Sequence, residues 1–319
     1  MSFRFPGGRR RIVIAVLGPT AAGKSRLGIA LAQTLDGEIV NCDSTAVYRR
    51  FDIGTDKVPD SERMGVPHHL IDIVEPIEPY SAARFANDAA AVIREIDARG
   101  RWPILVGGTG FYYRALVRGL FPGPARHDAL RHRLDRIAGR RGPAFLHKAL
   151  RRVDPDSAHR VQPGDQKRLV RALEVYVLTG RPMSAHFANT RSPLADYAFV
   201  SIGLQLPSAL TAERVARRVD DQFARGVVDE VRRMLGEGIP ETAHPFSGLV
   251  YRQVLDMLHG VRGEAETRAL IVRENRKYAR RQLIWFRKEP NLQWLNHPGE
   301  QAAALAGALD VLRSRGIGR

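Results

Sequence analysis

The chain has little of what secreted and membrane proteins need. Of its 319 residues only Cys42 is a cysteine, which excludes an intramolecular disulfide and a cysteine-based zinc site. No apolar run approaches the roughly 20 residues that a membrane-spanning helix requires. The apolar stretch 12–17, after a basic start, is too short for a signal sequence. We therefore expect a cytoplasmic protein in a reducing compartment, with residues 1–10 as a loose leader and no membrane contact.

Acidic residues are scarce relative to basic ones. Lysine and arginine total 50 against 34 aspartates and glutamates, so the net charge is +16. An excess of this size favours a polyanionic partner, nucleic acid first. The alternative is a general enrichment in arginine without a binding role, because arginine far outnumbers lysine. The length suits one large or two smaller globular domains.

The most informative segment is a glycine-rich loop that matches the pattern G-x-x-x-x-G-K-[ST]. It consists of Gly18, Pro19, Thr20, Ala21, Ala22, Gly23, Lys24 and Ser25. A buried strand is predicted before it at 12–17, and a helix after it at 26–35. In this setting the backbone N–H groups and the helix N-terminus bind an anion, Lys24 adds a positive charge, and the Ser25 hydroxyl can hold Mg²⁺. The loop therefore predicts a site for a di- or triphosphate.

Alternating elements predict an α/β fold, a P-loop-type parallel sheet flanked by helices. Further strands are expected at 38–42, 102–106 and 199–206. The clearest helices of this part are expected at 80–98, with Ser81 as N-cap, at 208–237 and at 264–286.

The pattern changes near Gly119, where strands give way to basic helical segments. These are expected at 126–140, 143–152 and 166–178. We interpret residues 119–195 as an all-helical insertion. The α/β core then comprises residues 1–118 and is completed by residues 196–319.

A carboxylate at a strand end is the first candidate for chemistry. Asp43 directly follows the strand at 38–42, and the carboxyl ends of parallel strands line the ligand crevice. It can act as a base or hold Mg²⁺ through water, or it can cap a turn with Ser44. The strand at 102–106 ends in Gly-Gly-Thr-Gly and not in an acid, which points away from a motor-type ATPase. Its glycine pair either admits a close neighbour or makes a tight turn.

Two further pairs have both a functional and a structural interpretation. His68 and His69 are adjacent, so on an extended segment they point to opposite faces, and a structural turn is favoured over a shared metal. Arg214 and Arg218 share one helix face, where they either clamp a diphosphate or form a solvated basic surface.

Seven segments together carry a family resemblance. They are GPTAAGKS (18–25), NCDSTAVYRRFDIGTDK (41–57), GVPHHLIDIVEP (65–76), YSAARF (80–85), PILVGGTGFYYRAL (103–116), DQKRLVRALEVYVLTGRP (165–182) and RQLIWFRK (281–288). In order and spacing the chain resembles the tRNA dimethylallyltransferases, also called tRNA isopentenyltransferases, from residue 13 to about residue 294. The resemblance departs at Ala46, where the family usually has glutamine, and at Val250, where a glycine usually precedes the tyrosine.

The resemblance implies a prenyl transfer to tRNA. Dimethylallyl diphosphate would donate its prenyl group to the exocyclic amine of the adenine 3′ of the anticodon, and the P-loop would hold the donor's diphosphate rather than ATP. Asp43 would be the general base. Lys24, Mg²⁺ at Ser25 and Arg218, chosen over Arg214, would stabilise the leaving group, with Thr20 over the diphosphate.

The resemblance also implies the tRNA contacts. The helical insertion would straddle the anticodon stem, its arginines contacting phosphates, and the target base would flip out of its stack. We expect a monomer, and the expected contact residues are Asp43, Ser44, Thr45, Ala46, Thr109, Arg131, Gln166, Lys167, Arg168, Leu169 and Val170.

Two other functions compete with this hypothesis. A P-loop kinase of a nucleotide or small metabolite would explain the loop, but it leaves the basic insertion without a role. A non-catalytic RNA-binding protein with a relict P-loop would explain the charge, but it does not account for the intact Lys24, Ser25 and Asp43.

Overall fold

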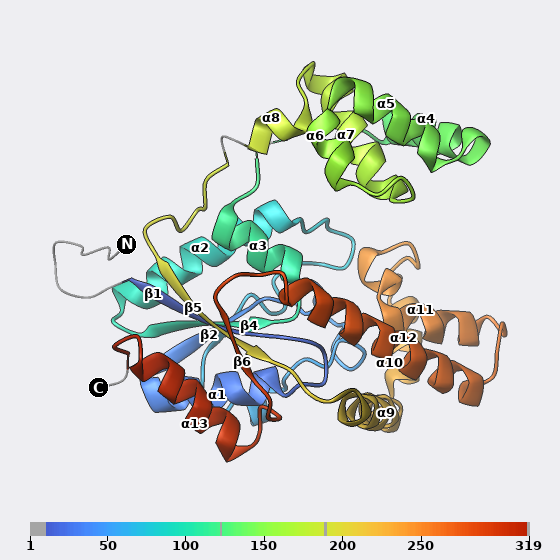
Figure 1. Cartoon of the computed structure of the whole chain (residues 1–319). Helices are drawn as coiled ribbons and strands as arrows, with labels where there is room; N and C mark the ends of the chain where they lie inside the picture. Colours follow the sequence, from blue (N-terminus) through green and yellow to red (C-terminus); the bar gives the residue numbers. More distant parts are fainter. Residues whose placement is uncertain (1–10, 122, 188–189, 318–319) are drawn as a thin grey trace. The chain divides into compact units, whose positions relative to one another are not determined.

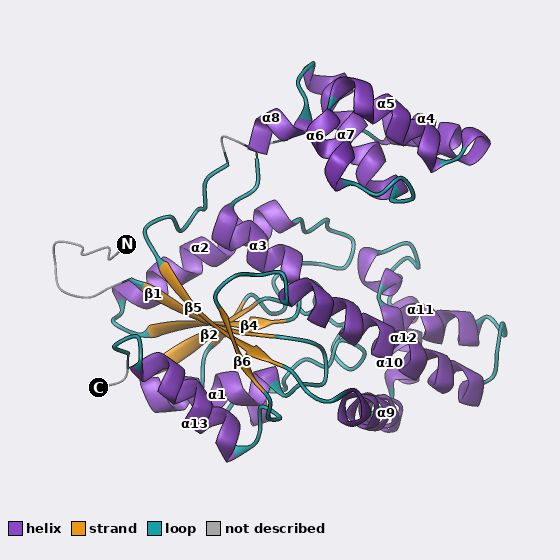
Figure 2. Ribbon diagram, in the orientation of Figure 1, coloured by secondary structure: helices purple, strands orange, loops and turns teal. Residues whose placement is uncertain are grey.

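The chain divides into two compact units. In this computed structural model, residues 11–121, 123–187 and 190–317 are described, so the predicted leader lies outside the described residues. One unit comprises Met1–Val117 and Pro193–Arg319, and the other Arg118–Ser192. The first carries the sheet and the second is helical (Figure 1, Figure 2).

A six-stranded parallel sheet forms the centre of the first unit. Its strands are β1 (Ile12–Leu17), β2 (Gly37–Asn41), β3 (His68–His69), β4 (Trp102–Gly107), β5 (Ala198–Leu204) and β6 (Leu292–Leu295). They are arranged in the order β3-β2-β4-β1-β5-β6, with every neighbouring pair parallel. The predicted parallel α/β fold is therefore confirmed.

Helices cover both faces of this sheet, which is why β1 is buried along its whole length. On one face, α1 (Lys24–Leu35) and α13 (Ala302–Arg313) pack Leu31, Ala308 and Leu312 against Ile14 and Val16. Figure 1 shows α2 (Ala82–Ala98) and α3 (Gly110–Arg118) on the opposite face. The Ser81 side chain accepts a hydrogen bond from the Arg84 N–H at 3.1 Å, so its predicted N-cap role is confirmed.

The C-terminal part adds a group of helices beside the sheet. These are α9 (Ser208–Ala224), α10 (Val227–Gly236), α11 (Leu249–Leu258) and α12 (Glu264–Phe286). The single helix predicted over 208–237 was wrong, because Gly226 adopts a φ of 87° and separates α9 from α10. None of the described helices is both long and apolar enough to cross a membrane.

The second unit has its own small core. Its helices are α4 (Asp128–Arg141), α5 (Pro143–Val153), α6 (Pro155–Arg160), α7 (Gln166–Thr179) and α8 (Met183–Phe187). Leu134, Leu146, Leu150 and Leu173 belong to one apolar cluster. The buried Asp154 carboxylate accepts hydrogen bonds from the Ser157 N–H at 3.0 Å and the Ser184 N–H at 3.0 Å, which joins α6 to α8.

The end of β4 tolerates no side chain. A methyl group at Gly107 would lie 2.1 Å from the Cys42 carbonyl oxygen. We predict that Gly107→Ala lowers the free energy of unfolding by about 1–3 kcal/mol, because the backbone at Cys42, directly after β2, must shift. Gly236→Ala, with open space around its Cβ, is the control and should change stability by no more than about 1 kcal/mol. Urea unfolding of both variants tests this, and equal stabilities would contradict it.

Candidate active site

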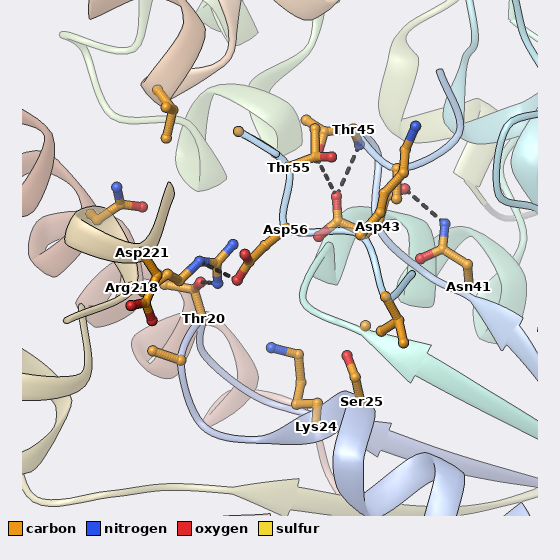
Figure 3. Close-up of a pocket in the computed structure, with 18 of the residues that line it drawn as sticks. Thr20, Lys24, Ser25, Asn41, Asp43, Thr45, Thr55, Asp56, Arg218 and Asp221 are labelled. Carbon is orange, nitrogen blue, oxygen red and sulfur yellow. Dashed lines mark hydrogen bonds and ion pairs between the residues drawn. The ribbon is translucent and has the colours of Figure 1, made fainter. Parts of the chain in front are cut away.

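A cavity of about 900 Å³ opens in the first unit, where the P-loop and the carboxyl ends of β2 and β4 meet. It is lined by the P-loop, by residues 54–59 and by side chains of α9, α11 and α12. Figure 3 shows Asp43 and Thr45 at one side of the cavity and the group Thr20, Arg218 and Asp56 at the other. The fold therefore brings the predicted phosphate loop and the predicted base to one cavity.

The P-loop backbone adopts conformations that only certain residues allow. Gly18 has a φ of 140° and Gly23 a φ of 87°, and a methyl group at Gly18 would lie 2.6 Å from the Leu204 carbonyl oxygen. The Lys24 ammonium donates to the Pro19 carbonyl oxygen at 2.8 Å. Burial lowers the pKa of Lys24 to about 8, although the Asp43 carboxylate opposes the shift.

A buried glutamine connects the P-loop to the glycine turn after β4. The Gln282 side chain accepts a hydrogen bond from the Thr20 N–H at 2.8 Å and donates one to the Gly108 carbonyl oxygen at 2.8 Å. A methyl group at Gly108 would lie 2.5 Å from the Gln282 amide nitrogen. Both interpretations of the glycine pair are confirmed, because β4 ends at Gly107 and α3 begins at Gly110, and Cys42 and Gln282 of the chain itself approach the two glycines closely.

Asp43 is oriented by its own turn. Its Oδ1 accepts hydrogen bonds from the Thr45 N–H at 2.9 Å and the Thr45 hydroxyl at 2.7 Å. Among the described residues no group bonds Oδ2, so that oxygen is available to a ligand. The turn-capping role and the role as a base are thus compatible, and the capped residue is Thr45 instead of Ser44.

The two arginines of α9 have different partners. Arg218 donates to the Thr20 hydroxyl at 2.5 Å and forms an ion pair with Asp56 at 2.7 Å. Arg214 donates to the Ala21 carbonyl oxygen at 2.6 Å and forms an ion pair with Glu300 at 2.5 Å. Neither belongs to a merely solvated basic face, and Arg218 is the one that contacts Thr20, the residue expected over the diphosphate.

Several residues that line the cavity were not predicted as site residues from the sequence. Asp56, Asp221, Tyr278 and Gln282 line it, yet none was predicted as a site residue. Asp56 and Gln282 lie in two of the segments that carry the family resemblance, which was the available signal. No local pattern indicates their roles, because their partners are remote in sequence.

His68 and His69 form the short strand β3 and not the predicted turn, and they have separate surroundings, as expected for neighbours on an extended segment. His68 lines the cavity, whereas His69 lies within 2.6 Å of Glu38.

No group of three potential metal-ligating side chains was found in the parts of the chain that the structure describes. Ser25 and Asp43 do place oxygen atoms at the cavity, and oxygen ligands are what Mg²⁺ prefers. The residues present therefore fit Mg²⁺ bound together with a phosphate ligand.

The predicted tRNA contacts of the first unit lie together. The Ser44 N–H donates to the Thr109 hydroxyl at 3.0 Å, and Thr45 and Ala46 line the cavity. Whether these residues contact RNA stays a prediction.

The predicted contacts in the helical unit differ in accessibility. Lys167 and Arg168 are exposed at the start of α7, and Gln166 donates to Asp135 at 2.7 Å. The side chains of Leu169 and Val170 are buried in the core of this unit, and whether this segment contacts RNA stays a prediction. Their apolar side chains fix α7 against its neighbours.

Arg131 also has a structural partner. Its guanidinium donates twice to the buried Glu174 carboxylate, both times at 2.8 Å. Burial raises the pKa of Glu174, but hydrogen bonds from Arg131, the His127 N–H and Arg171 outweigh this and lower it to about 2. Arg131 therefore joins α4 to α7, and a phosphate contact would have to compete with this pair.

Comparison with known proteins assigns the chain to a family. A family model described as IPP transferase matches residues 46–289. The chain belongs to the IPP transferase family. It is 41% identical over 303 residues to a tRNA dimethylallyltransferase of Koribacter versatilis (strain Ellin345), covering 95% of this chain and 98% of that protein. The resemblance seen in the sequence is thus confirmed.

Solved structures agree with this assignment. The full-length tRNA isopentenylpyrophosphate transferase from Bacillus halodurans is 35% identical, with a TM-score of 0.70 over 97% of this chain and 96% of that chain. A eukaryotic dimethylallyltransferase described as acting on tRNA is 28% identical, with a TM-score of 0.76 over 96% of this chain and 79% of that chain. These relatives are named for the transfer of a dimethylallyl or isopentenyl group and not of a phosphoryl group, which argues against the kinase alternative.

The lowered pKa of Lys24 predicts how anion binding depends on pH. Below pH 8 the ammonium is charged and attracts an anion, whereas above pH 8 the free protein must take up a proton to bind one. The affinity for inorganic diphosphate should therefore fall above pH 8, by up to about tenfold per pH unit. Calorimetric titrations from pH 7 to 9.5 measure this. The control, Lys24→Met, should bind weakly and lack this fall, and parallel profiles of the two proteins would refute the role of Lys24.

Proposed function

We propose that this chain transfers the dimethylallyl group of dimethylallyl diphosphate to the N6 amine of the adenine 3′-adjacent to the tRNA anticodon. The observation that carries the proposal is the pairing, in one cavity, of a complete phosphate-binding loop with the oriented carboxylate of Asp43. Membership of the IPP transferase family and the names of the relatives support it.

The reaction needs a base, because the N6 lone pair is delocalised into the adenine ring. In the proposed step Asp43 takes a proton from N6 while the new bond forms between N6 and C1 of the prenyl group. The bond between C1 and the diphosphate oxygen breaks, and the diphosphate leaves with the electron pair. The open Oδ2 of Asp43 is the atom suited to accept the proton.

The leaving diphosphate is stabilised by positive groups already in place. The P-loop N–H groups, Lys24 and Arg218 would bind the oxygens on which charge accumulates. Thr20, held by Arg218 and Gln282, would lie over the diphosphate. Ser25 would help to hold Mg²⁺, which when bound supplies further charge neutralisation.

The helical unit offers a basic surface suited to RNA phosphates. Its exposed basic side chains include Arg133, Arg136, Arg140, Arg141, Lys148, Arg151, Arg152, Lys167 and Arg168. Phosphate contacts set the orientation of the RNA and not its sequence, which suits binding to the anticodon stem. The target adenine would leave its stack to reach Asp43. We propose that the enzyme acts as a cytoplasmic monomer.

The proposed function has a direct test. Purified protein given dimethylallyl diphosphate, Mg²⁺ and an anticodon stem-loop with adenine 3′ of the anticodon should form N6-dimethylallyladenosine without ATP. Mass spectrometry of the digested RNA measures the product. A matched RNA with guanine at that position is the control and should stay unmodified. Phosphoryl transfer from ATP without any prenylation would refute the proposal.

Asp43→Asn tests the assignment of the base. The single-turnover rate of prenyl transfer should fall by about 10²- to 10⁴-fold, because the amide cannot accept the N6 proton. The tRNA dissociation constant should stay within about threefold, because the amide keeps an acceptor for the Thr45 N–H. Asp310→Asn, an exposed change on α13, is the control. An unchanged single-turnover rate in Asp43→Asn would exclude Asp43 as the base.

A further inference from the structure

A buried glutamate organises a loop beside the active site. Glu230, in the first turn of α10, is only 2% exposed. Its Oε1 accepts hydrogen bonds from the backbone N–H groups of Asp52 at 2.8 Å and Ile53 at 2.9 Å. Its Oε2 accepts from the Tyr251 hydroxyl at 2.8 Å. Every one of these contacts uses a glutamate oxygen as acceptor, which is the pattern that a carboxylate satisfies.

The next residue of this loop is held by a tyrosine. The Gly54 N–H donates to the Tyr251 hydroxyl oxygen at 3.0 Å, and a methyl group at Gly54 would lie 2.6 Å from the tyrosine ring. Burial raises the pKa of Tyr251, so its hydroxyl keeps the proton that it donates to Glu230. Gln222 of α9 adds weaker contacts to the carbonyl oxygens of Ile53 and Gly54, at 3.3 and 3.4 Å. The loop over 52–54 is thus fixed by side chains of α9, α10 and α11.

This loop delivers a carboxylate to the arginine of the active site. Two residues beyond Gly54, Asp56 has a φ of 59° and forms ion pairs with Arg218 at 2.7 Å and Arg225 at 2.6 Å. Arg218 in turn donates to the Thr20 hydroxyl. A continuous series of contacts therefore runs from Glu230 through the loop and Asp56 to Arg218 and the P-loop.

The position of Asp56 has an electrostatic cost. A carboxylate that lines a diphosphate cavity repels the ligand, so its charge lowers the affinity for the anion. It also restricts the guanidinium of Arg218 to one orientation, since the bond to Asp56 uses Nε and the bond to Thr20 uses a terminal nitrogen. Orientation of a charged donor before the reaction raises the rate more than it raises ground-state binding.

We propose that Asp56 and Glu230 are positioning residues for the transfer step, Asp56 by aiming Arg218 at the leaving diphosphate and Glu230 by fixing the loop that carries Asp56. This inference rests on the proposed function. It predicts that the affinity for diphosphate and the rate of transfer, which usually fall together, respond differently to the same substitution. Removing the charge of Asp56 should leave diphosphate binding unchanged or tighter and yet slow the transfer.

Asp56→Asn and Glu230→Gln test the inference. We expect each to lower the single-turnover rate of prenyl transfer by about 10- to 100-fold, because the donor groups are displaced from their best geometry. For Asp56→Asn the dissociation constant of inorganic diphosphate with Mg²⁺ should be unchanged or lower than that of the original protein. Asp229→Asn is the matched control, since Asp229 is the exposed neighbour of Glu230 and pairs only with Arg232 among the described residues. Its rate should be that of the original protein.

A double-mutant cycle separates positioning from a general structural effect. If Asp56 acts through Arg218, then Asp56→Asn should cause little further loss of rate in the Arg218→Ala background. An equal loss in both backgrounds, or an Asp56→Asn variant with an unchanged rate, would overturn the role of Asp56.

Hydrogen exchange tests the loop contact without any turnover. Either the amides of Asp52 and Ile53 or the amide of Gly54 should exchange faster in Glu230→Gln than in Asp229→Asn, because glutamine keeps an acceptor at only one of the two oxygen positions. If Glu230→Gln does not fold, Glu230→Asp, which keeps the charge on a shorter side chain, provides the same test at Asp52 and Ile53. Unchanged exchange in the folded variant would refute the role of Glu230.

Two outcomes separate this inference from the proposed function. If the original protein transfers no prenyl group, the proposed function fails. If the original protein transfers the group and both Asp56→Asn and Glu230→Gln have the same rate as the original protein, only the positioning inference fails.

Discussion

The candidate active site depends on a P-loop whose backbone is fixed by contacts with residues outside the loop. A P-loop binds an anion only if its N–H groups converge on one point. Here Gln282 bonds the Thr20 N–H, Arg214 bonds the Ala21 carbonyl oxygen, and Gly299 donates to the Ala22 carbonyl oxygen at 3.0 Å. Three segments of the C-terminal part thus brace successive residues of the loop, which explains why the helices beside the sheet belong to the catalytic unit.

Buried carboxylates organise this basic protein. Glu230 accepts hydrogen bonds from the N–H groups of one loop, Asp154 joins α6 to α8 in the helical unit, and Glu174 binds Arg131 and Arg171. Each of these acids is satisfied by several donors, as a buried charge must be. The arginines of this chain therefore fall into two groups with different roles. Some arginines neutralise internal acids, and the exposed ones remain for a polyanion.

Much of the fold could be predicted because its signals are local. The continuous apolar run of β1, the P-loop pattern and the span of α12 all depend on neighbours within a few residues. The short edge strands β3 and β6 were missed because they bury too little to show a pattern. The break at Gly226 was missed because a glycine inside a helical pattern does not reveal which backbone conformation it adopts.

The sequence by itself determined the class of the site and of the partner. The intact loop from Gly18 to Ser25 predicted a phosphate ligand, Asp43 predicted a carboxylate at a strand end, and the charge of +16 favoured a polyanion. Only the tertiary structure decided which side chains complete the site. Gln282 lies 262 positions from Thr20, and Asp56 reaches Arg218 through a loop that Glu230 holds. Such contacts form when the sheet and the helices pack, and packing between remote residues leaves no trace in a local pattern of residue types.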